Sequence, residues 1–254
     1  MALFNFLKAR RPIASGRGVE AIRPDDLFIV SYPRSGNTWM RFLLANLLAP
    51  HEAITFRNIE SHVPDIHKSA DTLAERPGRR FFKSHHPSYD SYPQFIYIYR
   101  DGRDALVSYY HYATGKKAFE GTFAEFVSSP LASKFGSWRA HVNGAFDFAK
   151  SRPDRVLLVQ YEQMLAHQTE GAARAAAFAK VKSDEESVAA AVAKSSFAEL
   201  KAIEEKFGGE ELGREGNFFR RGASGQWQEY FTGELYEKFL RENAETLLRL
   251  GYSL

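Results

Sequence analysis

The chain has 254 residues, of which 44% are hydrophobic and 26% are charged, and its formal net charge is +3. This length and composition predict one large globular domain, or two small ones at most, and exclude a disordered, collagen-like or coiled-coil chain. The lack of cysteine excludes a disulfide framework and a cysteine nucleophile. The chain has no apolar run of roughly 18 residues, which argues against a membrane span. Its small net charge argues against a nucleic-acid-binding protein.

The N-terminal segment, residues 1–26, is expected to be an extension ahead of a domain that occupies residues 27–254. Residues 1–7 are apolar and are followed by Lys8, Arg10 and Arg11. A secretory signal has the opposite order, with its charges ahead of a longer apolar core. We therefore expect a soluble, cytoplasmic protein that has neither a signal peptide nor a transmembrane segment.

Strand and helix patterns alternate along the rest of the chain. Short apolar runs predict buried strands at residues 27–31, 81–82, 95–99 and 156–160, and helical patterns occur at residues 38–48, 101–112, 122–129, 135–150 and 234–250. This alternation favours a single α/β domain with a central, mostly parallel β-sheet flanked by helices.

Two further segments have a distinctive composition. The alanine-rich stretch 171–194 predicts helix, with a second helix beginning at a capping box formed by Ser183 and Glu186. The glycine-rich segment 208–233 predicts a long ordered loop, and loops of this length are usually functional or disordered.

The strongest local signal is a P-loop-like segment directly after the first predicted strand, with the sequence SYPRSGNTW at residues 31–39. It opens the first predicted helix, so that backbone N–H groups and the helix N-terminus can hold an anion. The groups suited to an anion are Arg34, Ser35, Gly36, Asn37 and Thr38. The segment is not a Walker A loop, because no lysine follows Gly36, and this argues against hydrolysis of ATP or GTP.

This loop resembles the 5′-phosphosulfate-binding loop of cytosolic-type sulfotransferases, which take a sulfuryl group from 3′-phosphoadenosine-5′-phosphosulfate (PAPS) and release 3′-phosphoadenosine-5′-phosphate (PAP). Many members carry lysine at the position of Arg34, and some carbohydrate-directed members carry arginine. Four further segments resemble family motifs, at residues 83–85, 98–110, 158–164, and 195–197 together with 219–227. The resemblance extends from about residue 27 to the C-terminus.

The resemblance implies a donor site. Arg100 and Ser108 would bind the 3′-phosphate, Arg220 or Arg221 would close over it, and the alignment favours Arg220. Aromatic residues at three family positions would contact the adenine. The implied cofactor-binding residues are Arg34, Ser35, Gly36, Asn37, Thr38, Trp39, Arg100, Ser108, Tyr161, Ser195, Phe197, Arg220, Arg221 and Gly222.

The resemblance also implies the catalytic groups. His85 would accept the proton of the acceptor, and Lys83 and Arg34 would stabilise the charge that develops during in-line transfer. Side chains two apart on an extended backbone point the same way, so Lys83 and His85 should share a face and His86 should face away. Some carbohydrate-directed relatives use a glutamate as base, and this alternative stays open. The histidine spacing shows no metal-ligand constellation, so we expect no metal.

Two other functions stay open at this point, a small-molecule kinase with an unusual phosphate loop and a non-catalytic adenine-nucleotide-binding module. The acceptor could be a small molecule, a sugar, a lipid or a peptide, modified on a hydroxyl or an amine. The family's dimer motif aligns with residues 228–237, where Gln228 and Gly233 replace its lysine and valine. A monomer is therefore favoured over the family's dimer.

Overall fold

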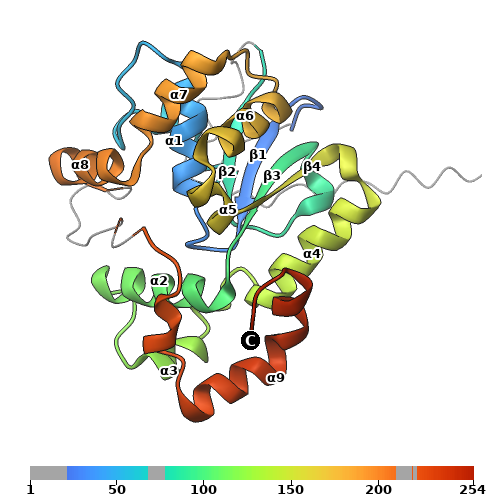
Figure 1. Cartoon of the computed structure of the whole chain (residues 1–254), viewed down its shortest axis with the longest axis vertical. Helices are drawn as coiled ribbons and strands as arrows, with labels where there is room; N and C mark the ends of the chain where they lie inside the picture. The colour runs from blue at the N-terminus through green and yellow to red at the C-terminus, as the bar shows by residue number, and fades with distance from the viewer. Residues whose placement is uncertain (1–21, 68–77, 210–218, 220–221) are drawn as a thin grey trace, which may run out of the picture.

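A four-stranded parallel sheet organises the computed structural model, which describes residues 22–67, 78–209, 219 and 222–254 (Figure 1). The strands are β1 (Leu27–Ser31), β2 (Phe81–Ser84), β3 (Gln94–Tyr99) and β4 (Val156–Gln160). Their spatial order is β2-β1-β3-β4, and all neighbouring pairs run parallel. The predicted α/β domain with a parallel sheet is thus confirmed.

The helices surround this sheet. Their bounds are α1 (Asn37–Leu48), α2 (Gly102–Gly115), α3 (Phe123–Val127), α4 (Trp138–Ser151), α5 (Tyr161–Ala166), α6 (Gln168–Ala179), α7 (Glu185–Lys194), α8 (Phe197–Phe207) and α9 (Gly233–Arg249). Short 3₁₀ turns lie at Ile59–Ser61, Tyr89–Ser91, Pro153–Arg155 and Gln226–Glu229. None of the helices in the described ranges is long and apolar enough to cross a membrane.

The predicted helices all occur, with ends shifted by a few residues, whereas α5 and α8 were not predicted. The predicted capping box of Ser183 and Glu186 is wrong by one position. The carboxylate of Asp184 caps α7 by accepting the Ser187 N–H at 2.8 Å, and the Ser187 hydroxyl accepts the Asp184 N–H at 2.9 Å. A carboxylate is favoured there because its negative charge also interacts with the positive end of the helix dipole.

Alternate residues of the strands pack into two apolar layers, one on each side of the sheet. Leu27 and Ile29 of β1 join the layer formed with α1, α6 and α7. Phe28 and Val30 join the opposite layer, formed with α2, α4 and α9 (Figure 1). The sheet is therefore buried on both faces, as is usual for parallel sheets.

The carboxyl ends of all four strands meet at one edge of the sheet, because the strands are parallel. The residues that follow are the loop 32–36 after β1, His85 after β2, Arg100 after β3 and Tyr161 after β4. The chain moves from β1 to β2 and then crosses to the other side of β1 to form β3. Ligands of such sheets bind outside the carboxyl ends at this change of direction.

Gly102, the first residue of α2, is required by its packing against α4. A Cβ atom on Gly102 would lie 2.3 Å from Cδ2 of Trp138, whose side chain is buried. We predict that Gly102→Ala lowers the free energy of unfolding by roughly 1–3 kcal/mol, the usual penalty for overpacking, measured by urea denaturation.

The matched control is Gly171→Ala in α6. A Cβ there would meet the flexible Met164 side chain at 3.1 Å, so this variant should keep its stability or gain up to about 1 kcal/mol from helix propensity. Equal stability of the two variants would contradict the packing argument.

Candidate functional site

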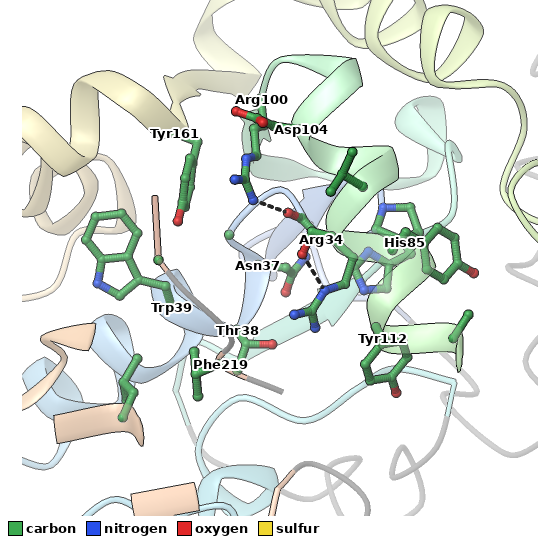
Figure 2. A pocket seen from close by; sticks show the side chains of 18 of the residues that line it. Arg34, Asn37, Thr38, Trp39, His85, Arg100, Asp104, Tyr112, Tyr161 and Phe219 are labelled. Carbon is green, nitrogen blue, oxygen red and sulfur yellow. Dashed lines mark hydrogen bonds between the residues drawn. The ribbon is translucent and has the colours of Figure 1, made fainter. Parts of the chain in front are cut away.

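A cavity of about 410 Å³ lies at the carboxyl edge of the sheet (Figure 2). Most of the predicted site residues line it: Arg34, Gly36, Asn37, Thr38, Trp39, Lys83, His85, Arg100, Ser108, Tyr161, Ser195, Phe197 and Gly222. Ser35 is fully buried and is not among the described lining residues. Arg220 and Arg221 lie outside the described residues. The structure therefore brings together residues from six separate segments of the chain.

The loop between β1 and α1 approaches the cavity closely at Gly36. Its φ is 104°, a conformation that favours glycine, and a Cβ would lie 2.8 Å from Cδ2 of Tyr161. Arg34 also has a positive φ, of 67°. Its Nε donates to Oγ of Ser108 at 3.2 Å, and its guanidinium lies 4.9 Å from the centre of the Tyr112 ring. These contacts direct the charge of Arg34 into the cavity (Figure 2).

Arg100 connects several parts of the site. Its Nη1 donates to the carbonyl of Arg34 at 3.1 Å, and its Nη2 donates to the carbonyl of Ala223 at 2.9 Å. Its guanidinium lies 4.4 Å from the centre of the Tyr161 ring. The buried Nε of Arg100 has no hydrogen-bond partner among the described residues. Because a buried donor without a partner is costly, this atom suits an anion bound in the cavity.

The aromatic residues predicted to contact adenine, Trp39, Tyr161 and Phe197, all line the cavity. The rings of Trp39 and Tyr161 are 5.9 Å apart and nearly perpendicular, at 81°, so they form a corner rather than two parallel faces. A Cβ on Gly222 would lie 2.3 Å from Cδ2 of Phe197, so only glycine allows this close approach. The buried hydroxyl of Ser195 accepts from Nδ2 of Asn46 at 3.2 Å, which fixes the chain just before Phe197.

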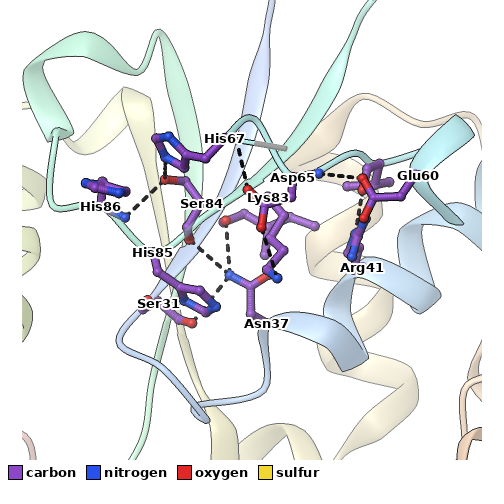
Figure 3. A network of polar contacts seen from close by, with 12 residues as sticks. Ser31, Asn37, Arg41, Glu60, Asp65, His67, Lys83, Ser84, His85 and His86 are labelled. Atoms are coloured by element: carbon purple, nitrogen blue, oxygen red, sulfur yellow. Dashed lines mark hydrogen bonds and ion pairs between the residues drawn. The ribbon is translucent and has the colours of Figure 1, made fainter. Parts of the chain in front are cut away.

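Lys83 and His85 both line the cavity, whereas His86 is not among its described lining residues. Nδ1 of His85 lies 2.8 Å from the carbonyl oxygen of Ser31 (Figure 3). A carbonyl can only accept, so Nδ1 carries the hydrogen and Nε2 is the basic nitrogen. The ring of His86 instead lies 4.2 Å from that of His67, and burial lowers the pKa of both histidines.

Asp65 is a site residue that sequence analysis missed. Its Oδ2 lies 3.3 Å from Nζ of Lys83, and the two side chains are 11% and 5% exposed, respectively. The segment reaches the site by adding to the edge of β2, where the Lys83 N–H donates to Pro64 at 2.8 Å and the Ile66 N–H donates to Lys83 at 3.1 Å. Neither a periodic pattern nor a motif surrounds Asp65 in the sequence.

Asp104 was also missed. Its carboxylate accepts the N–H groups of Gly225 at 2.6 Å and Trp227 at 3.0 Å, and it thereby fixes the glycine-rich segment to the first turn of α2. Burial raises the pKa of Asp104, and the charge of Arg100 opposes this effect. The signal in the sequence is an aspartate in the first helical turn after the predicted phosphate-binding Arg100.

Within the described part of the chain, no group of three or more His, Cys, Asp or Glu side chains is arranged to hold a metal ion. Three features fit a bound anion. The buried Nε of Arg100 and the buried hydroxyl of Ser35 have no hydrogen-bond partner among the described residues, and the backbone at Gly36 approaches the cavity closely. The charged groups of the cavity therefore suit an anionic nucleotide.

Comparison with known proteins gives consistent matches. The sequence model of the sulfotransferase domain matches residues 24–251. Flavonol 4′-sulfotransferase of Flaveria chlorifolia is 28% identical, covering 91% of this chain and 82% of that protein. Amine sulfotransferase of Oryctolagus cuniculus is 29% identical, covering 87% of this chain and 80% of that protein.

Two solved structures share the fold. A mouse sulfotransferase in complex with PAP gives a TM-score of 0.68 at 24% identity, over 89% of this chain and 84% of that chain. Retinol dehydratase in complex with retinol and PAP gives a TM-score of 0.68 at 22% identity, over 89% of this chain and 82% of that chain.

Proposed function

The chain belongs to the sulfotransferase family, and we propose that it transfers a sulfuryl group from PAPS to a hydroxyl group of a small-molecule acceptor, with His85 as the general base. The observation that carries this proposal is the convergence of Arg34, Arg100 and His85 on one cavity. Incubation with PAPS and a panel of acceptors, followed by detection of sulfated product and PAP, tests it.

The two alternatives have less support. Family membership argues against a small-molecule kinase, which would also need the lysine that is absent after Gly36. The positions of Lys83 and His85 on the cavity argue against a non-catalytic nucleotide-binding module, because a protein that only binds has no use for a base.

The donor half of the cavity has the groups that a nucleotide with several negative charges requires. Arg100 and Ser108 would hold the 3′-phosphate, and the loop from Arg34 to Thr38 would hold the 5′-phosphosulfate. When bound, PAPS supplies the sulfuryl group and a phosphate leaving group. Arg34 and Lys83 would stabilise negative charge as it moves onto that phosphate, a role in which fixed cations act strongly.

His85 is the proposed base because of its tautomer and its position. Its Nδ1–H donates to Ser31, so its Nε2 is able to accept a proton from an acceptor hydroxyl in the same cavity. The hydrogen bond to Ser31 also stabilises the imidazolium that forms. The carboxylate of Asp65, which also lines the cavity, is the alternative base, but its ion pair with Lys83 makes it a weaker proton acceptor.

The acceptor half has an aromatic and cationic lining. Tyr109, Tyr112 and Phe135 contribute rings, and Lys116 and Lys134 contribute charge. Neither of these two lysines forms an ion pair with a described carboxylate. Among known relatives, one is named for a flavonol and another for an amine. The lining supports an aromatic hydroxyl acceptor, and an acidic phenol rather than a cationic amine.

Arg100 tests the donor site. We predict that Arg100→Ala weakens PAP binding by roughly 2–5 kcal/mol, the usual effect of removing one partner of a buried charged pair. Binding of AMP, which has no 3′-phosphate, should change by less than about threefold, as measured by calorimetry. Equal losses for the two nucleotides would refute the assignment of Arg100 to the 3′-phosphate.

The two adjacent histidines test the base. His85→Ala should lower kcat by roughly a hundredfold or more, the usual effect of losing a general base, with PAP affinity nearly unchanged. His86→Ala should leave kcat within a few-fold, because its ring packs on His67. The rate of the unmodified enzyme should rise with pH as an imidazole loses its proton, and this rise should be absent in His85→Ala. Near-normal turnover of His85→Ala together with inactivity of Asp65→Asn would instead identify Asp65 as the base.

Charge reversal at Lys134, an exposed lysine of the cavity lining, tests the acceptor class. Lys134→Glu should shift the ratio of kcat/KM for 4-hydroxybenzoate over tyramine severalfold toward tyramine, since an exposed charge contributes up to about 1 kcal/mol. Lys150→Glu in α4 is the control, because Lys150 is exposed and is not among the described lining residues. A ratio that is the same in both variants would argue against an anionic acceptor.

A further inference from the structure

His141 of α4 makes a set of buried hydrogen bonds that the mechanism above does not use. His141 is only 1% exposed. Its Nε2 lies 2.9 Å from the carbonyl oxygen of His85, and its Nδ1 lies 2.7 Å from the hydroxyl of Tyr97. The hydroxyl of Tyr89 donates to the carbonyl of His141 itself. Three elements, β3, α4 and the end of β2, therefore meet at this imidazole.

Only one tautomer of His141 satisfies these contacts. The carbonyl of His85 can only accept, so Nε2 must carry the hydrogen, and Nδ1 then accepts from the hydroxyl of Tyr97. Burial lowers the pKa of His141 to about 4, so the ring is neutral at neutral pH. A neutral ring with a single N–H can donate to one acceptor, and here that acceptor is the backbone of His85.

The backbone of His85 needs this donor because it lies just beyond the end of β2 at Ser84. The side chain of His85 is held separately by the bond from its Nδ1 to Ser31. His141 is not among the described residues that line the cavity. It does not contact the cavity directly, and the bond from its Nε2 connects it to the site through the backbone of His85.

Helix α4 holds a second site residue in the same way. One turn before His141, the indole N–H of Trp138 donates to the carbonyl of Arg100 at 3.1 Å. Trp138 is 3% exposed and packs against Gly102, where no Cβ would fit. Residues three apart on a helix share a face, so one face of α4 binds the backbone carbonyls that follow both β2 and β3.

From these contacts we propose that His141 is the positioning residue of His85, and that α4 holds the base and the phosphate-binding Arg100 at a fixed separation through His141 and Trp138. This inference rests on the proposed function, in which His85 is the base and Arg100 contacts the donor. Loss of the His141 N–H would leave the partly buried carbonyl of His85 without this donor, and the backbone would move to find another. The bond from His85 to Ser31 would weaken, and Nε2 would become less basic.

The test compares His141→Phe with His141→Gln, because the amide nitrogen of glutamine can replace the Nε2–H donor whereas phenylalanine cannot. His141→Phe should lower kcat by about tenfold or more, a usual effect of removing a partner that orients a reactive histidine. It should shift the acidic limb of the pH–rate profile to lower pH and leave PAP affinity within about twofold. His141→Gln should restore most of kcat and the original profile.

Asn243→Leu in α9 is the matched control. It removes a different buried hydrogen bond, from Nδ2 of Asn243 to the carbonyl of Phe239 at 2.8 Å. It should leave the shape of the pH profile unchanged even if it destabilises the fold. A purely structural role for His141 would lower the number of PAP-binding sites and kcat in equal proportion, with the same profile as the unmodified enzyme, and that result would overturn the proposal.

Nitrogen NMR of labelled histidine separates this proposal from the assignment of the base. The His85 signals are identified by their loss in His85→Ala, and they report whether Nδ1 carries the hydrogen. His141→Phe should reduce the population of this tautomer whether or not His85 is the base, and an unchanged tautomer would overturn the proposal. If His141→Phe does not fold, the pair His141→Gln and His141→Asn gives the same comparison, because the shorter asparagine cannot reach the carbonyl of His85.

Discussion

The parallel register of the four strands is the constraint on which the site depends. Val30 of β1 is paired with Ser84 of β2, Ser31 is paired with Ile98 of β3, and Tyr99 is paired with Gln160 of β4. These pairings align the carboxyl ends of the four strands at one edge of the sheet. Residues that follow the four strands therefore surround the same cavity. Shifting one strand by a single residue would turn its side chains to the opposite face and would remove one functional group from the cavity.

Several cations at this edge repel one another, and carboxylates offset that repulsion. Lys83 is paired with Asp65, and the charge of Arg100 opposes the rise in the pKa of Asp104 that burial causes. Both carboxylates also accept bonds from backbone N–H groups that fix surrounding segments. These contacts offset part of the positive charge within the protein itself, while Nε of Arg100 has no partner among the described residues. Such preorganisation reduces the rearrangement that donor binding requires.

The lining of the proposed donor site was predicted from sequence through the family resemblance, and its residues converge because several of them follow strand ends. Gly36 lies in the loop that follows one predicted strand, Arg100 directly follows another, and the alternation of an extended chain distinguishes His85 from its neighbour His86. Helix α8 could have been predicted as well, since Ser196 and Glu199 form the beginning of a capping pattern and the Ser196 hydroxyl accepts the Glu199 N–H at 3.3 Å. The contacts of Asp65, His141 and Trp138 could not be predicted from sequence. Each joins segments that are far apart in the chain, through a backbone or ionic contact that leaves no periodic pattern in the sequence.

The contacts between distant segments also determine which parts of the site are held by packed elements. Strand alternation directs Tyr97 toward the α4 side of the sheet, where its hydroxyl meets His141, while Ile96 and Ile98 face α1 and its neighbours. The separation between His85 and Arg100 is therefore set by packed elements, namely β3 and one face of α4. The acceptor half, in contrast, is lined by the end of α2 and by residues 131–135, which lie between helices. Residues there can change without moving His85 relative to Arg100, because they are not part of β3 or of the face of α4 that contacts both residues.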